Sequence, residues 1–264
     1  MSDAINMEQV TVQRGETTLL SAVDLRVPEG SFLAIVGPNG SGKTTLLKTL
    51  LGLADPFGGV IRLMGDDAST LEPRERAAKV AWLPQKDFTA EPMAVLDFVM
   101  TSRYRFRESR DDSVAAARDA LRQVRLEQLE ARLVSTLSGG ECQRVSAACL
   151  LAQASPILLV DEPGNHLDPS QQLQIYTLLG EQWRAGKTVV CVTHDVNLLR
   201  HVGALDALAD VRVLGLSQGS RAFELSLIDD ALGGNLSDLF GVEFAALAAG
   251  DGPHFGISAR GAGH

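Results

Sequence analysis

Three glycines, a lysine and a threonine lie within eight residues, GPNGSGKT, at positions 37–44. The string fits the pattern G-x-x-x-x-G-K-[ST], and it stands between a short apolar run and a segment with helical periodicity. Glycines in such a turn let backbone N–H groups point inward around phosphate oxygens, and the start of the helix adds the positive end of its dipole. A chance glycine turn is the alternative, but it would not need this context. The sequence therefore predicts a nucleotide-phosphate site formed by Gly37, Pro38, Asn39, Gly40, Ser41, Gly42, Lys43, Thr44 and Thr45.

Two carboxylates end a second apolar run, ILLVDEP, at positions 157–163. An apolar strand in an α/β sheet delivers such residues to its carboxyl edge, where ligands bind. There Asp161 and the Thr44 hydroxyl would hold Mg²⁺, and Lys43 would reach the β- and γ-phosphates. Glu162 would act as general base on the attacking water. Taken alone, such a run is more often an ordinary strand that enters a loop. Because a phosphate loop lies upstream in this chain, the catalytic interpretation is favoured here.

The string LSGGECQR, residues 137–144, places a serine and two glycines before a helical segment, where free amides and the helix dipole can face an anion. An ordinary helix cap is the alternative. With the two preceding motifs, the chain resembles the ATP-binding cassette (ABC) proteins, whose signature this string matches. The resemblance implies that the cradle faces the ATP of an opposite protomer, so that two ATP molecules lie between two copies of the chain. The residues concerned are Ser138, Gly139, Gly140 and Glu141.

Three further positions match the family pattern, and the resemblance covers about residues 8–244. Gln85, in WLPQ, resembles the glutamine that meets Mg²⁺ and water and relays nucleotide state to a permease. His194, in VTHD, resembles the histidine that contacts the γ-phosphate. Asp168, in NHLD, resembles the aspartate of the loop that crosses the dimer interface. Each of these residues taken alone is more simply interpreted as a surface or structural residue. The match to the family depends on their order along the chain.

Two positions depart from the family pattern. Relatives usually place an aromatic ring for adenine just before Gly15, where this chain has Gln13 and Arg14. The Arg14 guanidinium could stack on the base instead, and we expect weaker selectivity for adenine. Position 164 is Gly where relatives commonly have Thr, which is expected to loosen the Asp168 loop without removing a catalytic group.

Alternating short apolar runs and helical segments must position these residues. Strands are expected at 10–13, 22–27, 32–36, 157–160 and 189–193, and helices after residue 42 and at 111–124, 140–154, 169–183 and 196–202. Continuous apolar strands alternating with helices predict an α/β fold with a mainly parallel sheet. The resemblance adds a P-loop NTPase (RecA-like) core, an N-terminal antiparallel β-subdomain and a helical signature subdomain at about 87–154. We expect one domain at 5–246 and a flexible tail at 247–264, which is rich in Gly and Ala.

Composition excludes several other classes of protein. The chain has 24 Lys and Arg against 33 Asp and Glu, a net charge of −9, and its densest basic stretch, 103–110, contains Glu108. A nucleic acid is therefore not expected as a partner. The three cysteines lack a C-x-x-C spacing, so reduced thiols are expected. No apolar stretch of about 18 residues and no signal peptide is present, so a membrane role would require a partner.

Several strings narrow the branch of the family, namely RERAAKVAWLPQ, SRYRFR, THDVNLL and LFGVEF. They resemble the ATPase subunits of importers for ferric siderophores, haem and cobalamin. The resemblance implies a second copy of the chain, a polytopic permease at the cytoplasmic face of the membrane and, indirectly, a substrate-binding protein. A permease helix is expected to dock beside Asp87 and Phe88. The alternative is a soluble ABC ATPase, such as one of iron–sulfur assembly, and an exporter is a third, less favoured possibility.

Overall fold

The computed structural model describes residues 2–85, 92–165, 167–247 and 252–258, so the expected docking residues Asp87 and Phe88 lie outside the described part. Its centre is a six-stranded sheet in the order β10-β9-β3-β8-β7-β6. Neighbours from β9 to β6 are parallel, and only the edge strand β10 is antiparallel. The strands are β3 (Phe32–Val36), β6 (Val80–Leu83), β7 (Ile157–Asp161), β8 (Thr188–Val192), β9 (Val211–Ser217) and β10 (Ser220–Ser226).

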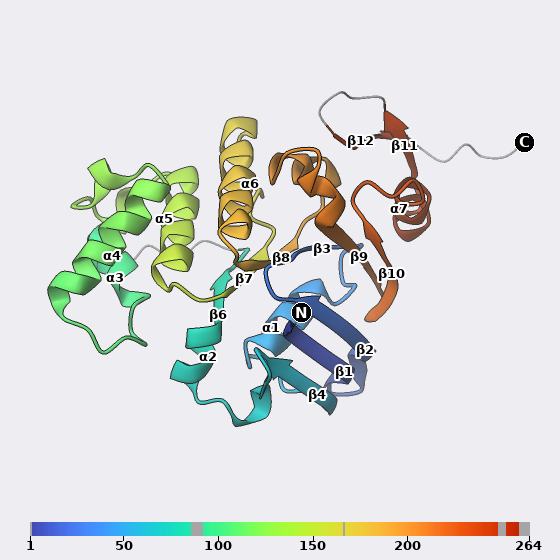
Figure 1. Cartoon of the computed structure of the whole chain (residues 1–264), viewed down its shortest axis with the longest axis horizontal. Helices are drawn as coiled ribbons and strands as arrows, with labels where there is room; N and C mark the ends of the chain where they lie inside the picture. Colours follow the sequence, from blue (N-terminus) through green and yellow to red (C-terminus); the bar gives the residue numbers. More distant parts are fainter. Residues whose placement is uncertain (1, 86–91, 166, 248–251, 259–264) are drawn as a thin grey trace, which may run out of the picture.

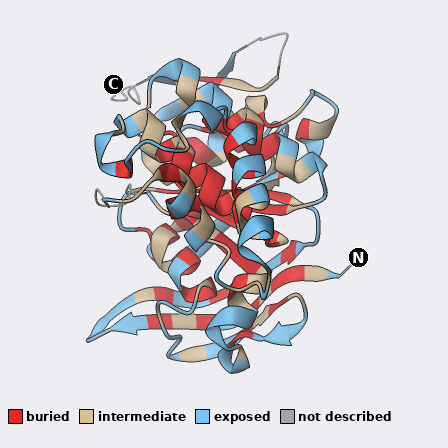
Figure 2. Ribbon diagram, turned by 90° about the vertical axis from the view of Figure 1, so that its left-hand side faces the viewer, coloured by how far each residue is buried: buried red, intermediate tan, exposed pale blue. Residues whose placement is uncertain are grey.

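The middle strands β3, β7 and β8 are apolar apart from Asp161 and Thr188 because both faces of this sheet are covered (Figures 1 and 2). In β3, Phe32 and Ala34 pack into the cluster that includes α5 (Gly139–Ala152) and α6 (Pro169–Arg184). Leu33 and Ile35 point the other way, into a second cluster with α1 (Lys43–Leu50). The predicted α/β fold with a mainly parallel sheet is therefore confirmed.

A separate antiparallel sheet at the N-terminal end has the order β2-β1-β4-β5. Its strands are β1 (Asp3–Arg14), β2 (Thr17–Pro28), β4 (Gly58–Leu63) and β5 (Asp66–Asp67). One face of this sheet packs on α1 through the second cluster, with Ile5, Leu20 and Leu63 fully buried. It corresponds to the expected β-subdomain, which therefore covers the first turn of the phosphate-loop helix.

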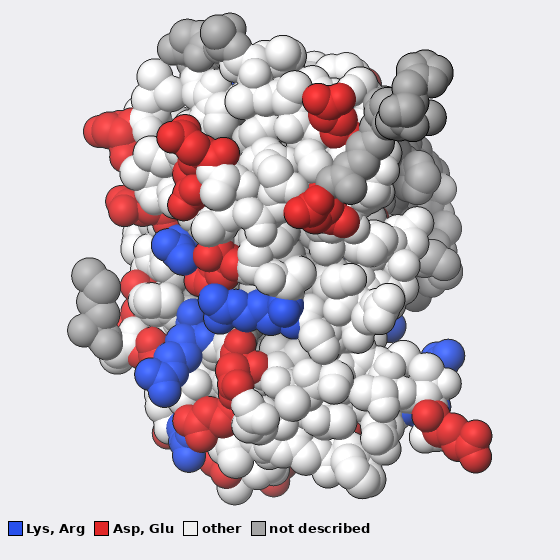
Figure 3. Space-filling view, turned by 90° about the vertical axis from the view of Figure 1, so that its right-hand side faces the viewer, with Lys and Arg blue, Asp and Glu red and all other residues white. Residues whose placement is uncertain are grey.

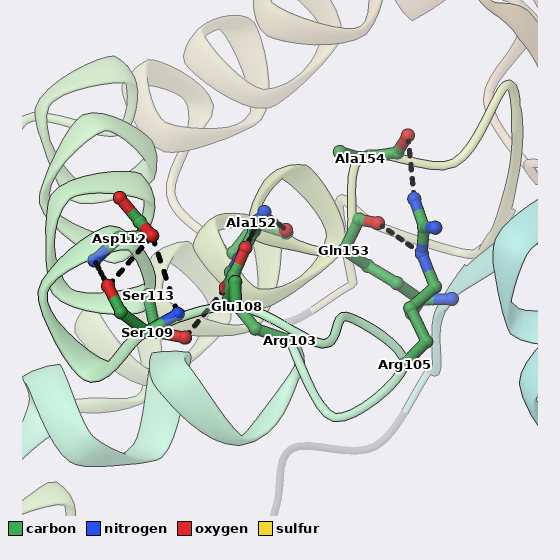
Figure 4. A network of polar contacts seen from close by, with 9 residues as sticks. All are labelled: Arg103, Arg105, Glu108, Ser109, Asp112, Ser113, Ala152, Gln153 and Ala154. Carbon is green, nitrogen blue, oxygen red and sulfur yellow. Dashed lines mark hydrogen bonds and ion pairs between the residues drawn. The ribbon is translucent and has the colours of Figure 1, made fainter.

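The described part of residues 92–154 holds helices and no named strand; its single isolated bridge joins Ala94 and Leu133. The helices are α3 (Val95–Thr101), α4 (Arg110–Gln123), η2 (Glu127–Leu129), η3 (Val134–Thr136) and α5. Two arginines satisfy the carbonyl groups at the end of α5 (Figure 4). Arg103 Nη1 donates to Ala152 O at 2.8 Å, and Arg105 Nε donates to Gln153 O at 3.1 Å. These bonds tie the connection between α3 and α4 to the far end of the signature helix.

The remaining elements lie outside the two sheets and the helical part. They are η1 (Ala68–Thr70), α2 (Pro73–Lys79), η4 (Val196–His201), η5 (Ala207–Asp210), α7 (Leu232–Phe240), β11 (Glu243–Leu247) and β12 (His254–Ser258). β11 and β12 form an antiparallel hairpin, so part of the expected 247–264 tail is a paired strand. No helix within the described ranges is both long and apolar enough to cross a bilayer.

Charges of both signs share the face that carries β2, β10 and this hairpin. In Figure 3 the basic side chains of that face lie mainly in one narrow band with carboxylates on both sides. Arg212 of β9 and Arg221 of β10 both contact Glu224, at 3.6 and 3.2 Å. The basic charge of this face is therefore largely compensated by its neighbours.

Candidate nucleotide and hydrolysis site

The phosphate loop joins β3 to α1 and depends on glycine at two close approaches. Gly37 has φ 157°, and a Cβ there would lie 2.2 Å from the carbonyl oxygen of Leu216. Gly42 has φ 100°, and a Cβ there would lie 2.8 Å from the carbonyl oxygen of Leu19. The remaining loop residues, Pro38, Asn39, Gly40 and Ser41, connect these two fixed points. Only glycine at both positions lets the loop pack on strands β2 and β9.

The side chain of Lys43 is directed into this loop. Its Nζ donates to the carbonyl oxygens of Gly37 at 2.8 Å and Pro38 at 3.0 Å, and the residue is buried. Burial lowers the pKa of Lys43, while the carboxylates of Glu162 and Asp161 oppose this shift. The structure therefore places the predicted Lys43 inside the loop, close to Glu162 and Asp161.

Asp161 lies at the carboxyl end of β7, one residue before Glu162. Burial raises the pKa of Asp161, and a hydrogen bond from Thr44 partly offsets this. Its Oδ1 is buried and has no hydrogen-bond partner among the described residues. An unpartnered carboxylate oxygen beside a hydroxyl is the kind of oxygen donor set that suits Mg²⁺. Residues 44 and 161 could thus hold the ion together with nucleotide phosphates.

Glu162 is the centre of a polar cluster formed by three segments of the chain. Its Oε2 accepts from Gln85 Nε2 at 2.5 Å and from Asn165 Nδ2. Its Oε1 lies 2.5 Å from His194 Nε2. The structure thereby brings together Gln85, Glu162 and His194, the three residues predicted to be catalytic. Asn165 was not predicted, because only its position three residues after Glu162, within NHLD, could have indicated it.

The backbone of Glu162 is unusual for a residue with a side chain. Its φ is 52°, in the left-handed region that costs a non-glycine residue roughly 1 kcal/mol or more. The conformation persists because the Glu162 N–H donates to Val192 O at 3.0 Å and the side chain is held by its three neighbours. Strain of this kind gathers at functional sites, and here it directs the carboxylate towards Gln85 and His194.

The signature residues lie on the helical part of the chain, at the start of α5. Ser138 caps the helix, and its N–H and Oγ both donate to Glu141 Oε2, at 2.8 and 2.9 Å. Ser138 and Gly139 are exposed. Gly140 packs so closely on α6 that a Cβ would lie 2.3 Å from the side chain of Gln171. The cradle is therefore open to solvent rather than turned into its own core.

Asp168 is also a cap, since its Oδ1 accepts from the N–H of Gln171 at 2.9 Å at the start of α6. It is exposed, as is the end of β1 that carries Gln13 and Arg14. Gly164 has room for a Cβ, whose nearest neighbours would be 3.5 Å away, and its carbonyl accepts from Gln172 at 3.0 Å. This bond holds the loop at position 164 despite the glycine.

All three cysteines lie within the described residues, and none of them is in a disulfide, as expected. Cys149 and Cys191 are buried, and burial raises the pKa of Cys149 to about 11. Cys191 lies in β8, and burial raises its pKa further still. Thiols in such surroundings stay protonated, so they behave as small apolar side chains.

Comparisons with known proteins agree with this site. The family model described as ABC transporter matches residues 20–165, which include the phosphate loop, the signature and the two carboxylates. The hemin import ATP-binding protein HmuV of Rhodopseudomonas palustris (strain BisA53) is 35% identical over 97% of this chain and 94% of its own length. The ferric enterobactin transport ATP-binding protein FepC of Escherichia coli (strain K12) is 34% identical over 86% of each chain.

The manganese transport system ATP-binding protein MntB of Bacillus subtilis (strain 168) is 32% identical over 89% of this chain and 94% of its own. Among solved structures, the dimeric cassette MJ0796 bound to ADP and phosphate has a TM-score of 0.74 at 31% identity. The match covers 84% of this chain and 98% of that one. The chain therefore belongs to the ABC transporter family, in which it is the ATP-hydrolysing subunit.

Proposed function

We propose that this chain drives the import of an iron chelate, haem or cobalamin through a partner permease. The proposal is supported by the similarity to HmuV and FepC, whose names specify hemin and ferric enterobactin and which match most of the chain. The similarity to MntB makes manganese the competing cargo. The soluble iron–sulfur assembly alternative gains no support from any of these relatives.

In the proposed reaction, the loop from Gly37 to Thr45 binds the phosphates of ATP, and Lys43 neutralises the β- and γ-phosphates. Thr44, Asp161 and Gln85 would hold Mg²⁺, which supplies charge neutralisation on the phosphate oxygens. The observation that carries the assignment is the Glu162 cluster. A buried carboxylate that already accepts two amide hydrogen bonds is positioned to accept a proton from the attacking water.

The other members of the cluster have distinct roles in this proposal. His194 donates to Glu162 through Nε2 and is partly exposed, so it can contact the γ-phosphate at the same time. Gln85 lies two residues beyond the end of β6 and donates to the Glu162 carboxylate. Asn165 donates to Glu162 Oε2, the same carboxylate oxygen that accepts from Gln85. Together they orient Glu162 and couple its position to the nucleotide.

The open cradle at the start of α5 requires a second copy of the chain. Ser138, Gly139, Gly140 and Glu141 present a helix N-terminus to solvent, and we infer that they complete the ATP site of the partner protomer. Asp168 lies on the neighbouring helix start, against which Gly140 packs through Gln171. Both loops therefore belong to one surface, and that surface is the proposed dimer interface.

The permease is proposed to dock in a groove between the core and the helical part. The groove has a volume of about 560 Å³, and its lining includes Leu53, Trp82, Pro84 and Tyr104. Leu53 is 62% exposed and Tyr104 is 51% exposed, so apolar surface is available to a partner. Pro84 immediately precedes Gln85, and Gln85 is hydrogen-bonded to Glu162, so the groove is connected to Glu162 through these two residues. An apolar helix of the permease would thus sense and alter the hydrolysis site.

One reconstitution tests both cargo and docking. The chain is assembled with its permease and binding protein in lipid nanodiscs, and ATPase activity is measured with ferric siderophores, haem, cobalamin or Mn²⁺. We expect an iron chelate, haem or cobalamin to stimulate hydrolysis. Stimulation by Mn²⁺ alone would overturn the branch assignment. Leu53→Asp should abolish stimulation and leave the basal rate of the isolated chain within about threefold of wild type.

The matched control for docking is Ile228→Asp, which places the same charge on a similarly exposed aliphatic side chain outside the groove. It should leave both the basal rate and the stimulation unchanged. If Leu53→Asp is stimulated as strongly as this control, the permease docks elsewhere. The cargo assignment would be untouched by that result, because it depends only on which molecule stimulates the wild type.

A further inference from the structure

The C-terminal hairpin is fastened to the segment that follows His194. Asn197 Oδ1 accepts from the N–H of Phe255 at 2.8 Å, and Asn197 Nδ2 donates to the carbonyl of Phe255 at 3.2 Å. Phe255 lies in β12 and its side chain is buried. The Asn197 amide therefore pairs with β12 as a peptide group of a neighbouring strand would. Figure 1 shows the hairpin at the end of the molecule that carries α7.

The hairpin is also held from α7, so it can serve as a fixed support. The N–H of Phe244 donates to Ser237 Oγ at 2.8 Å, and the ring of Phe244 lies 5.7 Å from that of Phe240. Gly233 of α7 approaches the Phe244 carbonyl so closely that a Cβ would lie 3.1 Å away. β11 is thus fixed to α7, and β12, its partner, presents Phe255 to Asn197.

His194 lies in a short segment that hydrogen bonds hold on both sides. On one side, Thr193 Oγ1 forms a 2.7 Å hydrogen bond with the buried hydroxyl of Tyr176 and accepts from the N–H of Asp195 at 3.2 Å. On the other side, Asp195 Oδ1 accepts from the N–H of Asn197 at 2.9 Å, which starts η4. Because η4 is a short 3₁₀-helix with weak internal hydrogen bonds, its position depends on tertiary contacts. The Asn197–Phe255 pair is such a contact, three residues from His194.

We propose that the C-terminal hairpin positions His194 for hydrolysis and that Asn197 is the positioning residue through which it acts. The inference rests on the proposed role of the Glu162–His194 contact. Without the amide pair, η4 keeps its apolar packing through Val196 and Leu199 but loses the contact of Asn197 with β12, and the imidazole is no longer held 2.5 Å from Glu162 Oε1. The loop of residues 37–45 keeps its own contacts with the phosphates, because none of the Asn197 contacts involves it, and only the contact of His194 with the γ-phosphate is weakened. The effect therefore falls mainly on the chemical step, and ATP capture by the loop is retained.

The test compares Asn197→Ala with wild type in steady-state ATPase assays of the full chain. We expect kcat to fall about tenfold, as for a slightly misplaced catalytic group, and KM for ATP to stay within about twofold. Asn235→Ala is the matched control, since among the described residues the side chain of Asn235 on α7 bonds only locally, to the carbonyl of Ala231. It should retain the wild-type kcat. An unchanged kcat in Asn197→Ala, or an equal fall in the control, overturns the proposal.

A double-mutant cycle separates positioning of His194 from general stabilisation. In a His194→Ala background, Asn197→Ala should cause no further loss of kcat, because the group that it positions is already absent. Losses that multiply would show that Asn197 acts by another route and would overturn the proposal. A His194→Ala variant with wild-type kcat would instead remove the proposed role of His194, which is a failure of the underlying function.

A second pair of variants covers the case in which Asn197→Ala does not fold. Asn197→Asp keeps the acceptor for the Phe255 N–H and loses the donor to its carbonyl, so half of the pair remains. A chain that ends at Val242 lacks both hairpin strands and leaves Asn197 intact. Both should lose kcat at unchanged KM, the truncated chain as much as Asn197→Ala and Asn197→Asp to a smaller extent. Full activity in both would overturn the proposal.

Discussion

At the residue scale, Gln13 and Arg14 stand where the resemblance to the family places recognition of the base. Both are exposed at the end of β1, in the hairpin that leads into β2. Neither offers the aromatic ring that relatives place there, although the guanidinium of Arg14 is planar and can stack. A guanidinium stacks on any purine, so this position has little means of distinguishing adenine from guanine.

Nucleotide competition should therefore show weak base selectivity. Loss of an aromatic stack removes about 1 kcal/mol of adenine binding, so GTP should bind within about tenfold of ATP. Competition against a fluorescent ATP analogue gives both affinities in one assay. Arg14→Tyr should restore a preference for ATP, with Arg26→Tyr on the neighbouring strand as control. A wild-type preference above about a hundredfold would show that a different ring stacks on the base.

The site residues differ in how well the sequence indicates them. Lys43, Asp161 and Glu162 lie in strings whose spacing itself encodes a strand end or a helix start, so their position follows from local rules. Gln85 and His194 were predicted only by resemblance, since the contact with Glu162 joins residues 77 and 32 positions apart. Such contacts depend on strand order in the sheet, which residue periodicity does not specify.

At the element scale, Glu108 is the centre of the hydrogen bonds that hold the end of α5. Its carboxylate accepts from Arg103 Nε and from Ser113 Oγ, each at 2.6 Å, while Arg103 also caps Ala152 (Figure 4). These hydrogen bonds lower the pKa of Glu108 from 4.5 to about 2, with that from Arg103 the largest cause. Glu108 thus keeps Arg103 oriented towards the end of the signature helix.

The stability of the chain should depend on this carboxylate in acid. Because the folded-state pKa lies below the unfolded one, the contribution of Glu108 is complete above pH 4.5 and is lost as the pH falls towards 2. Urea unfolding at pH 7, 5 and 3.5 should show Glu108→Gln less stable than wild type at pH 7, with a smaller difference at pH 3.5. A difference that does not change with pH would mean that Glu108 acts by packing alone. Glu127→Gln, in the exposed η2, is the control.

Element prediction succeeded where periodicity is strong and failed for several strands of four to seven residues. The helices expected at 111–124, 140–154 and 169–183 are α4, α5 and α6 to within two residues at either end. Strands β4, β6, β9 and β10 were not predicted, although turn residues separate β9 from β10. β6 has four residues and follows α2 without a turn, so it reads as the end of that helix. The hairpin strand β12 was read as a tail because Gly and Ala surround it.

At the scale of the whole molecule, one chain holds half of each proposed ATP site. The phosphate loop and Glu162 face one partner surface, and the Ser138 cradle supplies the other half to the second copy. The cradle's own Glu141 accepts both the N–H and the Oγ of Ser138, which lowers the pKa of Glu141 and keeps it charged. An arriving phosphate must compete with this carboxylate for the Ser138 hydroxyl.

Glu162→Gln should trap the ATP-bound dimer. The substitution removes the proton acceptor and keeps size and binding groups, so hydrolysis should fall by about a hundredfold or more while ATP is retained. Gel filtration with light scattering should then show a dimer in ATP and Mg²⁺ and a monomer in ADP. The double variant with Ser138→Arg should stay monomeric, whereas one with the exposed Ser135→Arg should still dimerise. A monomer in every nucleotide would contradict the shared-site proposal for the isolated chain.

The left-handed backbone of Glu162 also determines how this chain will respond to selection for stability. Glycine and asparagine accept a φ of 52° more readily than glutamate, so either residue would relieve strain that the fold now carries. Stabilising substitutions of this kind are easy to find and often remove function. A thermostability screen that does not assay turnover would therefore be expected to enrich replacements at position 162 early. The most thermostable variants from such a screen would then be the ones that do not hydrolyse ATP.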